Sequence, residues 1–235
     1  LLLESGIIRP KDLARKYNGE LWANEIMLLA YYIACVNIET TYQATASRGR
    51  PDDETAAYQP FPGATLTDTF QITEDGDKAD TSLIPANNDR IEAQLAAPIR
   101  VIVSNPPYSA GQGSANDNNA NLKYPTLDRR IADTYAARST RTNKNSLYDS
   151  YIRAFRWATD RIGDQEVVAF VSNGGWIDGN TGDGVRLSMA EDFTDLYVFN
   201  LRGNQRTAGE QSRKEGGKVF GSGSRSTVAI TVCVK

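Results

Sequence analysis

Apolar and polar positions follow two periods along the chain, and these periods predict strands and helices in alternation. Residues 21–26 form a short apolar run that predicts a strand. From residue 27 to about 42, apolar side chains recur at spacings of three and four, which predicts a helix with one wide buried face. Arg100–Ser104 is a continuous apolar run, which is typical of a strand buried on both faces of a parallel sheet.

The rest of the chain extends this alternation. Further helices are expected at 1–17 with a break at 6–10, at 128–138, at 147–162 and at 184–193; further strands are expected at 65–72, 167–172, 196–201 and 227–234. Loops or insertions are expected at 45–64 and 109–145, the second of which includes a short helix. The order predicts an α/β fold with a doubly wound sheet, in which ligands bind outside the carboxyl ends of the strands.

The composition fits an ordinary globular domain without histidine chemistry. Of the 235 residues, 40% are hydrophobic and 23% are charged, so we expect one large domain rather than two. The absence of His excludes His-dependent triads, His metal sites and His general bases, and no metal site is predicted. Cys35 and Cys233 lie far apart in apolar runs and are expected to be buried hydrophobic side chains rather than a disulfide.

The sequence shows neither a membrane segment nor a secretion signal. Its apolar runs are shorter than the roughly 18 to 20 residues that a membrane span needs, so we expect a cytoplasmic protein. The chain begins with Leu1 rather than Met, inside a predicted helix, and we expect it to be a fragment of a longer polypeptide.

The tetrapeptide Asn105–Tyr108, Asn-Pro-Pro-Tyr, follows the predicted strand and carries the most specific chemistry. The exocyclic amine of a base is a weak nucleophile because its lone pair is delocalised into the ring. The Asn105 side-chain oxygen and the Pro106 carbonyl can accept the two amine hydrogens and direct the lone pair towards an electrophilic methyl group. Pro106 and Pro107 stiffen the turn, and Tyr108 offers a ring on which a flipped base can stack. A rigid turn without function is the alternative.

This motif resembles that of the S-adenosylmethionine-dependent amino-methyltransferases, in which it follows the fourth strand of a Rossmann-like sheet. In the same family an acidic residue ends the second strand, and the resemblance implies that Glu25 and Ile26 contact the cofactor's ribose. It also implies that Asp68 and Phe70 contact the cofactor's adenine. A solvated helix-start residue is the alternative for Glu25, and a residue at an exposed strand edge is the alternative for Asp68.

Residues 100–162, Arg202–Asn204 and the closing segment 217–235 resemble the methyltransferase part of single-chain type ISP restriction-modification enzymes. Those enzymes also carry a helicase-like motor, a nuclease and a target-recognition domain. The resemblance implies methylation of adenine N6 in double-stranded DNA, with the flipped adenine held between Tyr108 and Phe220. A Phe220 that only anchors a loop to the core is the alternative.

One feature of the family is missing from this sequence. The glycine-rich cofactor loop follows the first strand and should precede the first helix, where this chain opens. We therefore expect a class I methyltransferase fold that lacks its first strand and glycine loop, with little or no methylation by these 235 residues alone. Phe220–Ser224 is rich in Gly, but it leads into a predicted strand rather than a helix and is not that loop.

Charge supports a nucleic-acid partner locally, although the formal net charge is only −3. Residues 122–156 carry eight basic and three acidic side chains, whereas residues 51–100 carry ten acidic and three basic ones and are expected to be a solvated insertion without function. The expected contacts to DNA backbone phosphates are Lys123, Arg129, Arg130, Arg138, Arg141 and Lys144. A solvated helix face is the alternative.

The sequence therefore predicts the catalytic domain of a bacterial DNA adenine-N6 methyltransferase, spanning residues 1–235 and using S-adenosylmethionine. Two alternatives stay open. One is methylation of a glutamine side chain or an RNA base, since the same tetrapeptide suits any planar amine or amide. The other is a non-catalytic DNA-binding fragment.

Overall fold

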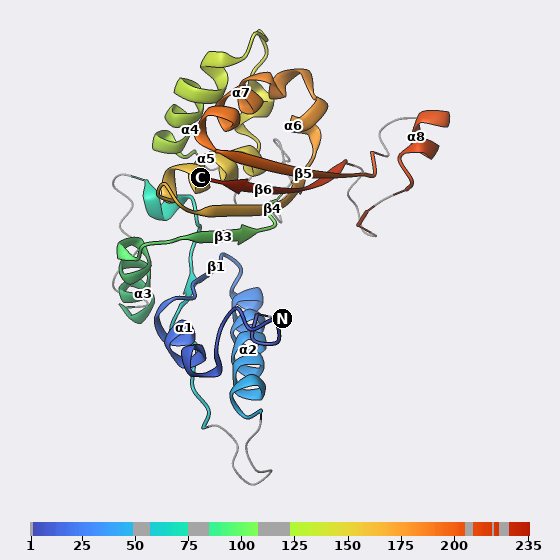
Figure 1. The fold of residues 1–235 in the computed structure, drawn as a ribbon. Helices are drawn as coiled ribbons and strands as arrows, with labels where there is room; N and C mark the ends of the chain where they lie inside the picture. The colour runs from blue at the N-terminus through green and yellow to red at the C-terminus, as the bar shows by residue number, and fades with distance from the viewer. Residues whose placement is uncertain are drawn as a thin grey trace. The chain divides into compact units, whose positions relative to one another are not determined.

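The computed structural model divides the chain into two compact units, Leu1–Ala97 and Pro98–Lys235 (Figure 1). The structure describes residues 2–48, 57–74, 85–107, 123–204, 209–217, 219–220 and 226–235, without the side chains of residues 211 and 212. Each unit has its own sheet and its own buried residues.

The first unit is built around a short parallel sheet of two strands. Its described elements are a 3-10 turn Pro10–Asp12, α1 Leu13–Gly19, β1 Ala23–Glu25, α2 Leu28–Ala46, β2 Ala64–Leu66, a 3-10 turn Gln71–Thr73 and α3 Pro85–Ala96. The register places Ala23 opposite Ala64 and Glu25 opposite Leu66. Both strands therefore end at the same edge of the sheet.

A small aromatic core holds the first unit together. Tyr17, Phe61 and Ala64 are buried, and the rings of Tyr17 and Tyr42 stack with centroids 3.7 Å apart. The Tyr17 hydroxyl donates a hydrogen bond to the Gln59 carbonyl at 2.9 Å, and burial raises the pKa of Tyr17 to about 12. The core joins α1, α2 and the segment before β2.

The burial predicted for α2 is wrong on one side of the helix. Tyr31, Cys35 and Ile38 pack on the small core, but Met27, which precedes the helix, and Val36 are both about 60% exposed. The periodicity correctly marks an apolar helix face, but burial also requires a partner. Among the described residues of this unit, nothing covers the outer part of that face.

The second unit contains a mixed four-stranded sheet in the order β3-β4-β6-β5. Its strands are β3 Val101–Ser104, β4 Val167–Asn173, β5 Asp195–Arg202 and β6 Val228–Val234. Its α-helices are α4 Pro125–Ile131, α5 Ser150–Arg161, α6 Gly175–Asp178, α7 Asp183–Asp192 and α8 Glu210–Lys214. A π-helical turn Ala132–Ala136 continues α4, and 3-10 turns Asn145–Tyr148 and Asn180–Gly182 precede α5 and α7. β3 and β4 are parallel, whereas β6 runs antiparallel to both β4 and β5.

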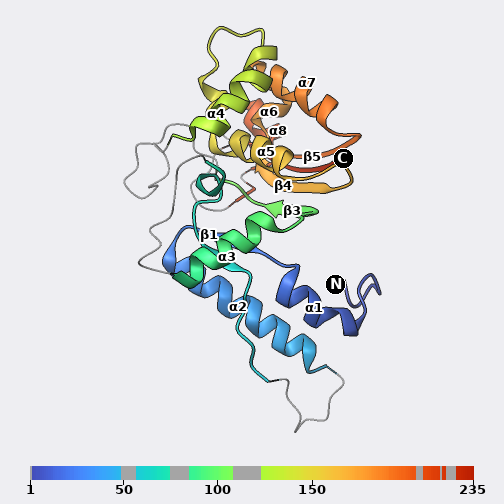
Figure 2. The same cartoon turned by 90° about the vertical axis from the view of Figure 1, so that its left-hand side faces the viewer.

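Helices α4, α5 and α7 lie on one side of this sheet, as Figure 2 shows. The strand β4 alternates, so that Val168 and Phe170 point towards these helices and are buried. The Phe155 ring of α5 lies 5.1 Å from the Phe170 ring and 5.7 Å from the Trp176 ring, centroid to centroid. All three of these aromatic residues are buried, so their packing contributes to the stability of the second unit.

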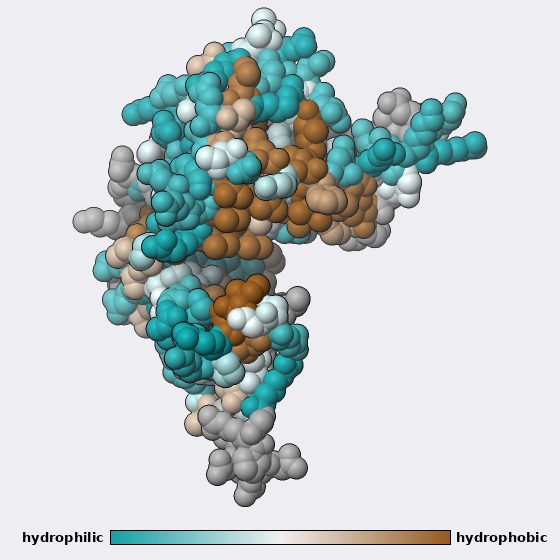
Figure 3. Space-filling view, in the orientation of Figure 1, coloured by the Kyte–Doolittle hydropathy of each residue, from teal (hydrophilic) through white to brown (hydrophobic). Residues whose placement is uncertain are grey.

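The opposite face of the sheet is apolar and exposed. Val101 and Val103 are 60% and 75% exposed, and Tyr197 and Phe199 of β5 are 56% and 71% exposed. Figure 3 shows the hydrophobic surface over β5 and β6. The prediction that β3 is buried on both faces is therefore wrong for the described part of this unit. An apolar run shows which residues could be buried, but a sheet face is buried only when another layer packs on it, and no described residue covers Val101 or Val103 in this way.

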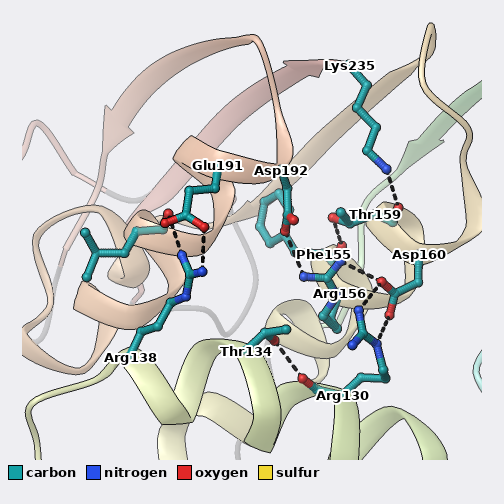
Figure 4. A network of polar contacts seen from close by, with 11 residues as sticks. Arg130, Thr134, Arg138, Phe155, Arg156, Thr159, Asp160, Glu191, Asp192 and Lys235 are labelled. Carbon is teal, nitrogen blue, oxygen red and sulfur yellow. Dashed lines mark hydrogen bonds and ion pairs between the residues drawn. The ribbon is translucent and has the colours of Figure 1, made fainter.

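A buried arginine ties α4, α5 and α7 together (Figure 4). The Arg156 side chain is only 3% exposed; it donates to Asp160 at 2.6 Å and to Asp192 at 2.8 Å. Arg130 of α4 donates twice to the same Asp160, each time at 3.0 Å. The Arg156 guanidinium also lies 5.5 Å from the centroid of the Tyr135 ring. The charges of this network are largely compensated within the unit.

The elements predicted for the second unit agree with the structure to within a few residues, whereas two of those predicted for the first unit do not. The predicted strand 65–72 ends at Leu66, the predicted helix 1–17 forms only from Leu13, and the sequence prediction did not include α3, α6 or α8. Cys35 and Cys233 are both free thiols; Cys233 is buried as expected, whereas Cys35 is only partly buried. None of the described helices is long and apolar enough to cross a lipid bilayer.

Candidate functional site

Two carboxylates follow neighbouring strands of the first unit. Glu25 is the last residue of β1, and Asp68 follows the end of β2 by two residues. The Thr67 amide donates to the Glu25 carbonyl at 2.9 Å, so the pairing continues just past the end of β2. This brings the predicted cofactor residues Glu25 and Asp68 to one edge of the sheet.

The Glu25 carboxylate is oriented by the backbone that follows it. Its Oε1 accepts hydrogen bonds from the Ile26 and Met27 amides at 2.9 and 3.0 Å, just before α2 begins. Both amides belong to residues that precede α2, so this contact holds the turn between β1 and the helix and is not a side-chain cap of α2. Both of these hydrogen bonds are made to Oε1, so the same carboxylate can also accept from a vicinal diol through Oε2. The Ile26 side chain is 44% exposed.

The Asp68 side chain forms a hydrogen bond with the backbone of the loop that follows β2. Its Oδ1 accepts from the Phe70 amide at 2.9 Å, which is the local turn that Asp side chains favour. The alternation at 65–72 that predicted a longer strand is interrupted by this turn. Asp68 and Phe70 are both partly buried, in the loop at the same edge as Glu25.

The Asn-Pro-Pro motif lies at the carboxyl end of β3 in the second unit, as predicted. β3 ends at Ser104, which is paired with Phe170 of β4. Asn105 and Pro107 are exposed and Pro106 is buried between them. The turn is anchored at Pro106 while the Asn105 side chain remains accessible at the surface. Tyr108 lies outside the described residues.

Other polar groups gather at the same edge of the four-stranded sheet. Since β6 is antiparallel to β4, its beginning lies beside the end of β4, and the Gly174 amide donates to the Thr227 carbonyl at 3.0 Å. The Thr227 hydroxyl donates to Asn200 Oδ1 of β5 at 3.4 Å. Asn200 and Thr227 were not among the predicted site residues, because only the strand order brings them together.

Arg202 ends β5 in a left-handed conformation, with φ of 61°. Such a conformation is uncommon for a residue with a Cβ and is found more often at functional sites. It is supported by Asn200, whose Oδ1 accepts from the Arg202 amide at 2.9 Å. The sequence analysis included Arg202 only as part of a segment that resembles type ISP enzymes, and it did not predict this backbone conformation. Phe220, the other predicted base contact, is 38% exposed.

The six predicted phosphate contacts fall into two groups in the structure. Arg130 and Arg138 pair with Asp160 and Glu191 of the same unit. The Lys144 ammonium donates to the Ala136 carbonyl. The remaining three, Lys123, Arg129 and Arg141, are exposed and form no ion pair with the described residues.

A shallow cavity of about 250 Å³ lies at the opposite end of β1 and β2 from Glu25. Trp22 and Gly63, which precede the two strands, line it together with Asp89 and Arg90 of α3. It does not include the predicted cofactor residues. Among the described residues, no three His, Cys, Asp or Glu side chains are grouped so as to hold a metal ion.

Solved structures of restriction-modification enzymes contain a segment similar to this chain. A nuclease-deletion mutant of the type ISP enzyme LlaGI in complex with a DNA substrate mimic is 47% identical over the whole chain, with a TM-score of 0.91. The ATP-dependent type ISP enzyme LlaBIII bound to DNA is 43% identical over the whole chain, with a TM-score of 0.88. A DrdV–DNA complex is 41% identical over 98% of the chain, with a TM-score of 0.85.

The chain spans only 18%, 15% and 21% of the lengths of those three solved chains. No family model and no curated protein matches it. The similarity therefore connects this chain to one segment of much longer DNA-bound enzymes.

Proposed function

We propose that this chain is part of the methyltransferase region of a type ISP restriction-modification enzyme, and that the whole enzyme methylates adenine N6 in DNA with S-adenosylmethionine. The observation that carries the proposal is the exposed Asn105 side chain on a turn anchored by the buried Pro106, at the carboxyl end of a parallel strand. The similarity to segments of DNA-bound type ISP enzymes favours DNA over RNA or a protein glutamine as the substrate. A Rossmann-like sheet is part of the same proposal.

In this proposal, Asn105 and Pro106 bind the amine that is methylated. The Asn105 side-chain oxygen and the Pro106 carbonyl accept its two hydrogens, which holds the nitrogen lone pair out of the ring's conjugation. The chain needs no strong base for this, because methyl transfer leaves the nitrogen positively charged and acidic enough to release one proton to water. Tyr108 and Phe220 stack on the faces of the flipped base and hold it in place.

The carboxylates at the edge of the first unit's sheet fit the polar groups of the cofactor. A ribose diol and an adenine amine are hydrogen-bond donors, and Glu25 and Asp68 provide fixed acceptors because one oxygen of each is bonded to the backbone. Glu25 and Ile26 would hold the ribose, and Asp68 and Phe70 would hold the adenine ring. When bound, S-adenosylmethionine supplies the electrophilic methyl group.

The class of substrate can be tested with the full-length enzyme and S-adenosylmethionine carrying a tritiated methyl group. We expect label in double-stranded DNA that contains the enzyme's target. Label confined to RNA or to a protein substrate would contradict the proposal. DNA methylated beforehand at the target adenines is the control and should accept little label.

The exposed basic residues are expected to contribute most of this unit's charge-dependent DNA binding. Replacing Lys123, Arg129 and Arg141 together by Ala should lower the slope of log K against log salt by up to about 0.9 per lost phosphate contact. Replacing Arg130 and Arg138 should change this slope less, because carboxylates of the same unit already compensate their charge. Salt titrations of DNA binding by the full-length enzyme measure both slopes. Equal effects per residue in the two groups would contradict this assignment.

A further inference from the structure

One face of α3 makes polar contacts with the sheet of the first unit. Asn87, Arg90 and Gln94 are spaced by three and four residues and therefore share one helix face, which we call the α3 polar face. Asn87 and Arg90 form hydrogen bonds to β2, and Gln94 forms one to β1. A face that contacts a sheet is usually apolar, so this one needs another explanation than burial of hydrophobic area.

Asn87 completes the hydrogen bonding of the outer edge of β2. Its Oδ1 accepts from the Leu66 amide at 2.8 Å, and its Nδ2 donates to the Leu66 carbonyl at 3.0 Å. A strand residue directs its amide and carbonyl to the same side, and those of Leu66 point away from β1. The Asn87 amide therefore takes the position that a third strand would otherwise fill. It does so two residues before Asp68.

Arg90 contacts the same outer edge of β2, closer to the start of the strand. Its guanidinium donates to the Ala64 carbonyl at 3.3 Å and to the Tyr31 hydroxyl of α2 at 3.1 Å. Ala64 is two residues before Leu66 and directs its carbonyl to the same side. The outer edge of β2 is thus held by side chains of a helix.

Gln94 reaches the other strand through Asn24. The Asn24 Oδ1 accepts from Gln94 Nε2 and from the Thr65 hydroxyl, both at 2.7 Å. The Asn24 Nδ2 in turn donates to the Thr69 hydroxyl at 3.3 Å. Gln94 is 7% exposed and Thr65 is fully buried, so water does not readily replace these partners.

These contacts end directly beside the two carboxylates. Asn24 precedes Glu25 in β1, and Thr69 follows Asp68 in the loop after β2. The hydrogen bond between Asn24 and Thr69 joins the two strand ends, and Asn87 fixes the last residue of β2.

We infer that the α3 polar face, through Asn87, Asn24 and Thr69, positions Glu25 and Asp68 for cofactor binding. The inference rests on the proposed function, since it concerns the same cofactor residues. These are positioning residues: they act through the backbone ends of β1 and β2. Their loss should weaken binding of S-adenosylmethionine and leave the chemistry of the bound complex nearly unchanged.

The first test compares Asn87→Ala with Glu92→Ala in the full-length enzyme. Glu92 is an exposed residue of the same helix, so it controls for general effects of changing α3. We expect Asn87→Ala to raise the KM for S-adenosylmethionine about tenfold, as expected for losing two hydrogen bonds, with kcat and the KM for DNA within about twofold of the parent. Glu92→Ala should change none of these constants.

Thr69→Val tests the same inference without touching the edge of β2. The change removes only the hydroxyl that accepts from Asn24, and Thr69→Ser restores a hydroxyl. We expect a KM for S-adenosylmethionine that rises about threefold in Thr69→Val and returns to the parental value in Thr69→Ser. Because Thr69 is only partly buried, both variants should fold like the parent.

Calorimetric measurement of S-adenosylmethionine binding to Glu25→Ala and Asp68→Ala, beside Asn87→Ala and Thr69→Val, separates this inference from the proposed function. If these two changes weaken cofactor binding while Asn87→Ala and Thr69→Val do not, the positioning role is wrong and the cofactor assignment stands. If none of the four changes affects cofactor binding, the cofactor assignment itself is wrong. A lower melting temperature with an unchanged KM in Asn87→Ala and Thr69→Val would show that α3 is only structural.

Discussion

Replacing Asn105 by Ala in the full-length enzyme is expected to lower the rate of methyl transfer at least about a hundredfold, which is typical of losing one preorganised group that acts in the transition state. The change removes the side-chain oxygen that we assign to the target amine and leaves the Pro106 turn in place. Because Asn105 is exposed, the change creates no cavity and should not lower stability. Single-turnover transfer of a tritiated methyl group to DNA measures the rate.

Two controls accompany Asn105→Ala. Asn37→Ala makes the same chemical change at an exposed position of α2 and should leave the transfer rate at the parental value. DNA binding by the Asn105→Ala enzyme, measured by mobility shift, should also persist. A rate within about threefold of the parent would rule out Asn105 as an amine-binding group.

Replacing Arg156 by Ala is expected to lower the stability of the second unit by a large amount. The Arg156 side chain is 3% exposed and compensates Asp160 and Asp192, which are each about a third exposed. Removing one partner of a buried ion pair costs about 3–5 kcal/mol, and the partial exposure of the two carboxylates places this case near 3 kcal/mol. Hydrogen exchange of α5 and β6 in the full-length enzyme should therefore become roughly a hundredfold faster.

The matched control is Arg129→Ala, since Arg129 is exposed and forms no ion pair with the described residues. Its exchange rates in α5 and β6 should equal those of the parent. Unchanged exchange in Arg156→Ala would contradict a stabilising role for the network.

The effect of Arg156 should also depend on pH. Burial raises the pKa of Asp160, but hydrogen bonds from Arg130 and the charge of Arg156 outweigh it and hold that pKa below its usual value. A carboxylate whose pKa is lower in the folded state than in the unfolded state stabilises the fold at pH values above its unfolded pKa of about 3.9. This stabilisation is lost as the pH falls through the lower pKa of the folded state. The difference in stability between the parent and Arg156→Ala should therefore shrink below about pH 4.

The sequence was most informative where burial and local geometry agree. The strands β4 and β6 alternate and are flanked by turns, so their positions could be predicted to within one or two residues. The end of β3 could be predicted as well, because Asn105–Pro107 cannot continue a ladder. The position of the candidate amine site at a strand end could therefore be predicted from the sequence.

Burial could not be predicted, because it depends on partners that lie elsewhere. Both α2 and β3 are apolar, yet Val36 and Val103 are exposed in their respective units. The α3 polar face was missed for the opposite reason. Residues 51–100 are acidic on average and were expected to be solvated, whereas Gln94 is buried against Asn24 of β1. A polar side chain that replaces a strand partner has no sequence signal of its own.

The central claim is that neutral oxygens after β3 hold an exocyclic amine for methylation, and analysis of the modified nucleoside tests it most directly. DNA is incubated with the full-length enzyme and S-adenosylmethionine carrying a deuterated methyl group, digested to nucleosides and analysed by mass spectrometry. We predict that the label appears on N6 of adenine and is absent when Asn105 is replaced by Ala. Label on a ring carbon, or equal N6 labelling by the Asn105→Ala enzyme, would contradict the account.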